Sequence, residues 1–169
     1  MKRIGLLSDT HGHLDKGVKK HFAECDEIWH AGDIGTLEVS DSLSEWKPLR
    51  AVYGNIDGGK LRLIHPENQL FELEGVKVLI THIGGYPGRY EPRVRQLILK
   101  EKPKLYICGH SHILKVMPDR KNNLLHMNPG AAGIYGIHQV KTLLRFTLDA
   151  GDIKGLEVIE LGKRSVMKS

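Results

Sequence analysis

The sequence predicts an α/β (α+β) fold in which a mixed β-sheet system carries helices on its outside. Two observations indicate this class: apolar strands alternate with helical segments in the first third of the chain, and hairpin-like pairs of strands dominate afterwards. A length of 169 residues suits one sizeable core, and 40% hydrophobic with 27% charged residues is typical of an ordinary globular protein. We expect a single domain over residues 1–162 and a solvated basic C-terminal tail at 163–169.

The first part of the chain is predicted to alternate strands with helices. Apolar runs that end in polar, glycine-containing loops indicate strands, and apolar residues at helical spacing indicate helices. The expected elements are a strand and loop at 2–13, a helix at 14–25, a strand and loop at 27–35, a helix at 37–46, and a strand and loop at 48–58.

The second part is predicted to contain mostly strands. Two apolar runs within 68–85 are separated by Glu74 and Gly75, which favours a hairpin. Residues 91–102 have a helical pattern, and residues 104–112 are a further strand and loop. The rest, 113–136 and 139–161, indicates successive strands with turns at Asn122 to Asn123 and at Gly151.

Charge and cysteine content narrow the classes of partner. The formal net charge is +5, but the basic residues are spread along the chain and cluster densely only at its end, so nucleic-acid binding is not expected. No signal-peptide core or bilayer-length apolar stretch is present, so we expect no membrane association. Cys25 and Cys108 lie in or beside apolar segments, which favours free thiols in a reducing, cytoplasmic protein.

Side chains able to bind metals follow five of the predicted strands. The loops read SDTHG, GDIG, GNID, THIGG and GHSH, and in the last of these His110 and His112 point to the same side if the segment is extended. Loops at the carboxyl ends of parallel strands converge on one crevice. The sequence therefore predicts that seven residues share one site: Asp9, His11, Asp33, Asn55, His82, His110 and His112.

Each of these residues also has an ordinary structural interpretation. Asp9 and Asp33 suit turns or helix caps, Asn55 follows a glycine as turn residues often do, and His82 is compatible with a packed histidine. Their joint occurrence in five separate loops favours a metal site. The mixed nitrogen and oxygen donors suit borderline divalent metals, and seven ligands suit two ions that share a carboxylate.

The order of these motifs resembles the calcineurin-like metallophosphoesterases. D-x-H, G-D, G-N-x-D, an isolated histidine and G-H-x-H run from Asp9 to His112, about two-thirds of the chain. The small size, the N-P-G-A stretch at 128–131 and the strand-rich end are similar to the small bacterial and archaeal phosphodiesterases (YfcE type). The resemblance implies a four-layer sandwich in which helices flank two packed mixed β-sheets.

The resemblance also implies a role for each ligand. Asp9, His11, Asp33 and His112 are expected to hold one divalent metal ion, and Asp33, Asn55, His82 and His110 the other, with Asp33 as the bridge. Manganese is the first expectation, with iron, nickel, cobalt and zinc as alternatives. The expected reaction is hydrolysis of a small phosphodiester by a metal-bridging hydroxide, which attacks phosphorus in line with the leaving oxygen.

Two positions depart from the family pattern. Thr36 stands where a second aspartate of G-D-x-x-D is common, which leaves the ligands intact. Ile56 replaces the histidine of G-N-H-[DE] that faces the leaving group, and this favours diesters or activated esters over alkyl monoesters. The further histidines His13, His30 and His138 are candidates to assist the reaction, but a structural role is favoured for each.

Two other functions and one question of assembly stay open at this stage. A weak or inactive scaffold is the main alternative, as in the retromer subunit that resembles this family. A nuclease has no support from an aromatic-studded basic groove. An exposed edge strand would allow a homo-oligomer.

Overall fold

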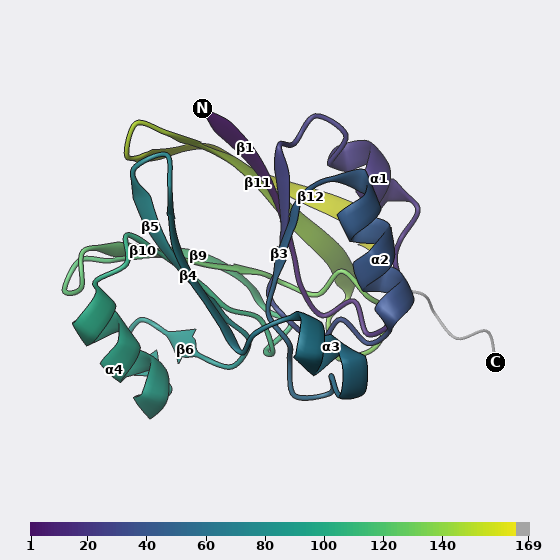
Figure 1. Ribbon diagram of the computed structural model, residues 1–169, viewed down its shortest axis with the longest axis horizontal. Coiled ribbons are helices and arrows are strands. Elements are labelled where there is room, and N and C mark those ends of the chain that lie inside the picture. Colours follow the sequence, from purple (N-terminus) through teal and green to yellow (C-terminus); the bar gives the residue numbers. More distant parts are fainter. Residues whose placement is uncertain (165–169) are drawn as a thin grey trace.

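Two five-stranded mixed β-sheets form the middle of the molecule in the computed structural model, which describes residues 1–164 (Figure 1). The first sheet has the order β12-β11-β1-β2-β3. Its strands are β1 (Lys2–Leu7), β2 (Glu27–His30), β3 (Leu49–Ala51), β11 (Val140–Asp149) and β12 (Asp152–Lys163). The predicted tail begins at the last residue of β12, and its residues 165–169 lie outside the described residues.

The second sheet has the order β4-β5-β8-β10-β9. Its strands are β4 (Asn68–Leu73), β5 (Val76–Thr81), β8 (Leu105–Ile107), β9 (Leu114–Asp119) and β10 (Leu124–Pro129). The helices are α1 (Gly17–His21), α2 (Leu37–Trp46), α3 (Gly59–Ile64) and α4 (Pro92–Glu101). A small hairpin pairs β6 (Gly85–Tyr86) with β7 (Arg89–Tyr90). None of the helices in residues 1–164 is long and apolar enough to cross a membrane.

Each sheet contains three adjacent parallel strands. In the first sheet β1, β2 and β3 run parallel, and in the second β5, β8 and β10 do. The antiparallel partners β11, β12, β4 and β9 lie outside them. Consequently the loops that follow β1, β2 and β3 leave one edge of their sheet together, as do those after β5 and β8.

Side chains alternate between the two faces of each strand, and this alternation divides the core into layers. Leu6 packs between the two sheets, whereas its neighbour Leu7 packs in the cluster that includes the helix residues Val18 and Leu43. In the second sheet Ile80 faces the first sheet, and Leu79 packs in the cluster that contains residues of α4. Figure 1 shows α1 and α2 beside the first sheet and α4 beyond the second. The four layers are therefore helix, sheet, sheet and helix, which confirms the predicted fold class.

Most predicted elements are present, but the helix predicted at 14–25 was too long. The α-helix covers only Gly17–His21. Val18, Phe22 and Cys25 still pack in one cluster, so the apolar spacing was a correct guide to burial. The chain leaves the helix after His21 and reaches β1, where the N–H of Asp26 donates to the carbonyl of Arg3 and the Asp26 carboxylate accepts from the Arg3 N–H, both at 2.7 Å.

Three elements were missed because they are short. The helix α3 is six residues long and buries only Leu61, which is too little to give a helical period. The strands β6 and β7 have two residues each and are joined by Pro87 and Gly88. Gly88 has φ +89°, and a glycine after a proline suits a turn that needs positive φ at its third position.

Candidate metal centre

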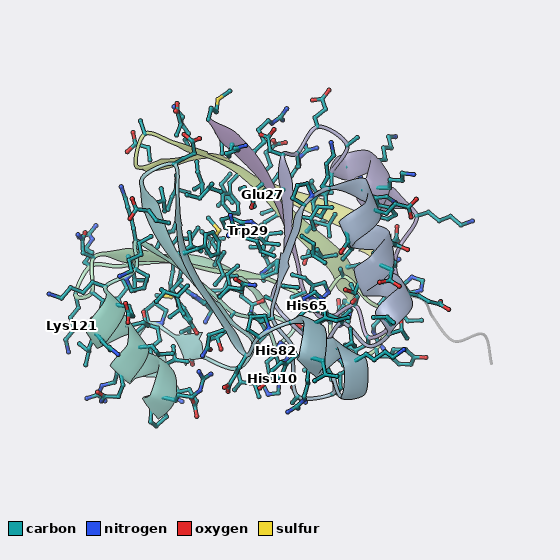
Figure 2. All side chains as sticks on the ribbon, viewed as in Figure 1. Glu27, Trp29, His65, His82, His110 and Lys121 are labelled. Atoms are coloured by element: carbon teal, nitrogen blue, oxygen red, sulfur yellow. The ribbon has the colours of Figure 1, made fainter. Side chains whose placement is uncertain are left out.

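The structure brings all seven predicted site residues together where the two sheets meet at the carboxyl ends of their parallel strands. Asp9 and His11 follow β1, Asp33 follows β2, and Asn55 follows β3. The other three follow strands of the second sheet: His82 comes after β5, and His110 and His112 come after β8. In Figure 2 the labelled His82 and His110 lie next to each other below the strands.

The seven residues form two groups of close ligand atoms. Asp9, His11 and His112 each offer one such atom, and these atoms lie within 4.8 Å of one another. The Asp9 Oδ1 atom is 3.2 Å from His112 Nε2 and 3.7 Å from His11 Nε2. Asp33, His82 and His110 form the second group with the same mutual limit of 4.8 Å.

Asp33 lies between the two groups, and Asn55 adjoins the second. The Asp33 Oδ2 atom is 3.3 Å from His11 Nε2, which belongs to the first group, and 3.2 Å from His82 Nε2 in the second. The Asn55 Oδ1 atom is 3.1 Å from His110 Nδ1. One carboxylate oxygen of Asp33 is therefore within 3.3 Å of a histidine nitrogen of each group.

The loops hold several of these residues in a rarely used backbone conformation. Positive φ occurs at five site residues: Asp9 (54°), His11 (46°), Asp33 (55°), His110 (72°) and His112 (62°). Such a conformation costs about 1–3 kcal/mol for a residue with a side chain and tends to occur at functional sites. Backbone hydrogen bonds from Asp9 N–H to the Gly32 carbonyl and from His11 N–H to the Asp33 carbonyl, both 3.0 Å, keep the first two loops in place.

Neighbouring groups aim the ligand atoms inward. The Asp9 Oδ2 atom accepts from the Ser8 hydroxyl at 2.6 Å and from the His110 N–H at 3.1 Å, which leaves Oδ1 facing the histidines. His82 Nδ1–H donates to the Ala31 carbonyl at 2.7 Å, so its Nε2 is the free ring nitrogen. A ring fixed through its second nitrogen is typical of metal-binding histidines.

Three of the inward-facing atoms are buried without a hydrogen-bond partner among the described residues. They are Asp9 Oδ1, His11 Nε2 and His82 Nε2. Asp9 is fully buried, and an unpaired polar atom in such a place is costly. A divalent cation accepts lone pairs from one carboxylate oxygen and two ring nitrogens, so these residues fit a metal ion.

The charges of the site are coupled. Burial acts to raise the pKa of Asp9 and of Asp33, but the close approach of His11 and of the other histidines outweighs it and holds both pKa values well below the usual range. The nearby carboxylates of Asp33 and Asp9 raise the pKa of His11 to about 9. Burial acts to lower the pKa of His82, and the nearby Asp33 carboxylate more than offsets this. Histidine protons thus balance the carboxylates, and a bound cation would replace them.

Two further residues, Asp57 and His30, support the loops that carry the candidate ligands, and no individual role was predicted for Asp57. The buried carboxylate of Asp57 accepts from the N–H groups of Ile34 (3.0 Å), Gly35 (2.9 Å) and Gly54 (2.8 Å), which ties the Asp33 loop to the Asn55 loop. Asp57 ends the G-N-x-D motif, so the motif itself was the available signal.

His30 is the other supporting residue. Its Nδ1 accepts from the Gly32 N–H at 3.0 Å, and its Nε2 lies 3.0 Å from the Thr10 hydroxyl. Burial lowers the pKa of His30 to about 4, so the ring is neutral at pH 7. Thr10 in turn donates to the Ile34 carbonyl at 2.9 Å, and His30 thereby connects the first two loops in the structural role expected for it.

Residues 1–151 match the family model described as the calcineurin-like phosphoesterase superfamily domain. The chain belongs to this superfamily. A probable metallophosphoesterase from Methanocaldococcus jannaschii is 31% identical over 134 residues, which are 76% of this chain and 67% of the relative. A phosphodiesterase from the same organism is 29% identical over 147 residues, covering 76% of this chain and 82% of the relative. The crystal structure of Vps29 from Chaetomium thermophilum has a TM-score of 0.74 at 15% identity and covers 96% of this chain and 100% of that one.

Both departures from the superfamily pattern have a clear place in the structure. Thr36 is the N-cap of α2, where its hydroxyl accepts from the Val39 N–H at 3.4 Å. Ile56 is 48% exposed, and its N–H donates to Asp33 Oδ1 at 3.1 Å. The backbone at position 56 therefore still orients Asp33, although the side chain offers no acid for a leaving group.

Proposed function

We propose that this phosphoesterase is a two-metal phosphodiesterase whose domain spans residues 1–162. One divalent cation would be held by Asp9, His11, Asp33 and His112, and the other by Asp33, Asn55, His82 and His110. The observation that carries the proposal is the convergence of the buried unpartnered atoms of Asp9, His11 and His82 around Asp33. Manganese is the first metal to test. When bound, such a pair of ions supplies Lewis-acid stabilisation of phosphoryl oxygens and a water activated as nucleophile.

The residues of this chain would hold and orient rather than react. Ser8 and the His110 backbone fix Asp9, and Ala31 fixes His82, so neither ligand has to reorganise when substrate binds. Asn55 contributes an amide oxygen without charge. Two buried carboxylates, Asp9 and Asp33, carry less negative charge than two divalent cations carry positive charge, so the loaded centre would attract an anionic phosphate ester.

Two features favour diesters over monoesters. The exposed Ile56 gives no general acid, a group whose contribution is about 10²–10⁴ in rate, so a substrate with a good leaving group or one less negative charge is favoured. The second feature is a pair of cavities that both have Ile83 in their walls. One includes His110, and the other, of about 220 Å³, includes Asn55, His82 and Arg93. A diester has two organic groups, one for each cavity.

A scaffold is the second candidate, since the fold is also that of Vps29. A chain that acts only as a scaffold does not need three buried ligand atoms without partners, and such atoms lower its stability. The presence of these residues therefore favours the enzyme.

The test is hydrolysis by metal-stripped protein resupplied with one divalent metal at a time. The substrates are bis(4-nitrophenyl) phosphate and 4-nitrophenyl phosphate. Metal-dependent turnover that prefers the diester is expected, with loss of activity in Asp33→Ala. Asp41→Ala is the matched control, because Asp41 is an exposed carboxylate on α2. If the folded wild-type protein is inactive with every metal, the enzyme proposal fails and the scaffold gains.

A further inference from the structure

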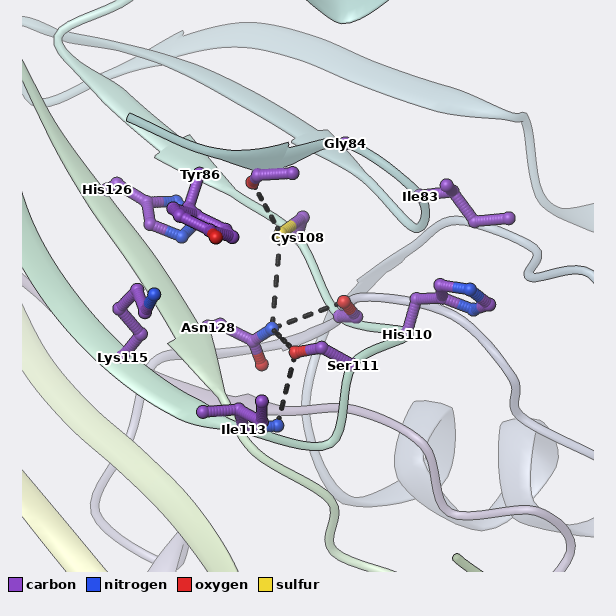
Figure 3. A pocket seen from close by; sticks show the side chains of 12 residues that line it. Ile83, Gly84, Tyr86, Cys108, His110, Ser111, Ile113, Lys115, His126 and Asn128 are labelled. Atoms are coloured by element: carbon purple, nitrogen blue, oxygen red, sulfur yellow. Dashed lines mark hydrogen bonds between the residues drawn. The ribbon is translucent and has the colours of Figure 1, made fainter. Parts of the chain in front are cut away.

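A cavity of about 160 Å³ opens beside the second ligand group (Figure 3). His110 belongs both to that group and to the cavity wall, so a group attached to a phosphate at the centre has direct access to the cavity. The wall residues come from the loop after β5, from β6, from the loop after β8, and from β9 and β10. We call this space the His110 cavity.

The floor of the His110 cavity has little spare hydrogen-bonding capacity. The Asn128 amide donates to the Gly109 carbonyl at 3.2 Å and to the Ser111 hydroxyl at 3.1 Å, and its oxygen accepts from the Gly130 N–H at 3.0 Å. The Cys108 thiol donates to the Gly85 carbonyl at 3.4 Å. Figure 3 marks the bonds of the Asn128 amide nitrogen and of the Cys108 thiol with dashed lines. A ligand here gains mainly apolar contact rather than new hydrogen bonds.

The side walls are apolar or aromatic. Ile83 is 38% exposed and Ile113 is 56% exposed, and both line the cavity. Tyr86 and His126 also line the cavity, on the side away from His110 in Figure 3. Burial of a flat ring against these side chains removes apolar surface from water and allows aromatic contacts.

Lys115 gives the cavity a positive charge. Its Nζ lies 3.7 Å from the centre of the Tyr86 ring, and no carboxylate of residues 1–164 lies within 4.0 Å of it. Burial lowers the pKa of His126 to about 4 and raises the pKa of Cys108 to about 11, so both are neutral at pH 7. The Lys115 ammonium is therefore available to a hydrogen-bond acceptor on a ligand.

We propose that the His110 cavity binds a single six-membered aromatic ring carried by one ester group of the substrate, with an acceptor substituent facing Lys115. The inference rests on the proposed function, because the phosphate must be held beside His110. An apolar cavity of about 150 Å³ accommodates benzene. A volume of about 160 Å³ thus suits one ring.

The test is calorimetric binding of phosphonates, whose P–C bond the enzyme does not hydrolyse, to manganese-loaded protein. The probes are methylphosphonate, phenylphosphonate and 4-nitrophenylphosphonate. The extra ring carbons should make phenylphosphonate bind about tenfold more tightly than methylphosphonate. The nitro oxygens should add several-fold more through Lys115.

Two pairs of variants separate the contributions. Tyr86→Ala should remove most of the preference for a ring, and Lys115→Met should reduce binding of the nitrophenyl probe to that of the phenyl probe. The matched controls are Tyr135→Ala, an exposed tyrosine outside the cavity whose ring is 6.4 Å from that of His11, and Lys121→Met, an exposed lysine on the turn after β9 (Figure 2). Both controls should keep the wild-type ratios, and thermal unfolding checks that all four variants are folded.

The outcomes distinguish this inference from the proposed function. If all three phosphonates bind equally to protein that carries its metals, the ring site is refuted and the metal centre stands. If the folded protein binds neither metals nor phosphonates, the proposed function itself fails and the ring site fails with it.

Discussion

Replacement of Asp57 by asparagine should weaken both the fold and the metal centre. Asp57 is 3% exposed, and its carboxylate accepts three backbone hydrogen bonds. One oxygen serves both Ile34 and Gly54, and the other serves Gly35. Even if the asparagine oxygen takes the position that serves two donors, its NH₂ group then faces the Gly35 N–H. One hydrogen bond is lost, two donors oppose each other, and the other two bonds lose their charge.

The size of the effect follows from these contacts. A hydrogen bond to a charged group contributes about 1.5–3 kcal/mol, so we expect Asp57→Asn to lower the free energy of unfolding by about 2–3 kcal/mol. Ile34 and Gly54 adjoin the proposed ligands Asp33 and Asn55, so metal affinity should also fall, by about 10- to 100-fold as for other residues that support ligands.

Urea unfolding of the metal-free protein measures the first effect, and metal titration of the folded variant measures the second. Asp41→Asn on the exposed face of α2 is the control and should change neither quantity. A loss of stability below about 0.5 kcal/mol together with wild-type metal affinity would refute the idea that Asp57 ties the loops together, because surface substitutions produce changes of that size.

Two further predictions concern acid stability and close packing. Burial holds the pKa of His30 at about 4 in the folded protein, against 6.5 for a free histidine. Below pH 6.5 the unfolded chain therefore binds more protons than the folded one. The contribution of neutral His30 to the free energy of unfolding is complete above pH 6.5 and is lost progressively between pH 6.5 and 4. Urea unfolding at a series of pH values should show this loss, up to about 3 kcal/mol, and a His30→Gln variant should show a shallower slope. A methyl group on Gly54 would lie 2.1 Å from Asp33 Oδ1, so Gly54→Ala should abolish tight metal binding, whereas Gly58→Ala, with nothing within 4 Å, should keep it. Equal metal affinity of these two variants would contradict the packing seen around Asp33.

The grouping of the candidate ligands was predictable from the sequence because these residues are chemically conspicuous. Asp9, His11 and Asp33 are metal-capable residues that come soon after apolar strands. Because the carboxyl ends of parallel strands converge, such residues are brought close together. The two-sheet architecture was predicted from the family that the same motifs resemble. The helix α2 was predicted from the helical spacing of its apolar residues alone. Its predicted bounds, 37–46, coincide with those in the structure.

The supporting residues and small elements were not predictable in the same way. Asp57 and His30 act on backbone N–H groups of loops, and which loop lies beside which is decided by the tertiary fold. The His110 cavity has the same origin, since Tyr86, Lys115 and His126 come from three different strands. The helix α1 ends at His21, and the chain then pairs Asp26 with Arg3 of β1. This contact joins residues far apart in the sequence, so the helical spacing of apolar residues does not predict it.

Counting and locating the metal ions tests the central claim most directly. Metal-stripped protein is dialysed against manganese, the bound metal is measured by elemental analysis, and the sites are located by anomalous diffraction. We expect two ions per chain, about 3.5–4 Å apart, with Asp33 between them. A single ion, no ion, or two ions away from Asp33 would contradict the account.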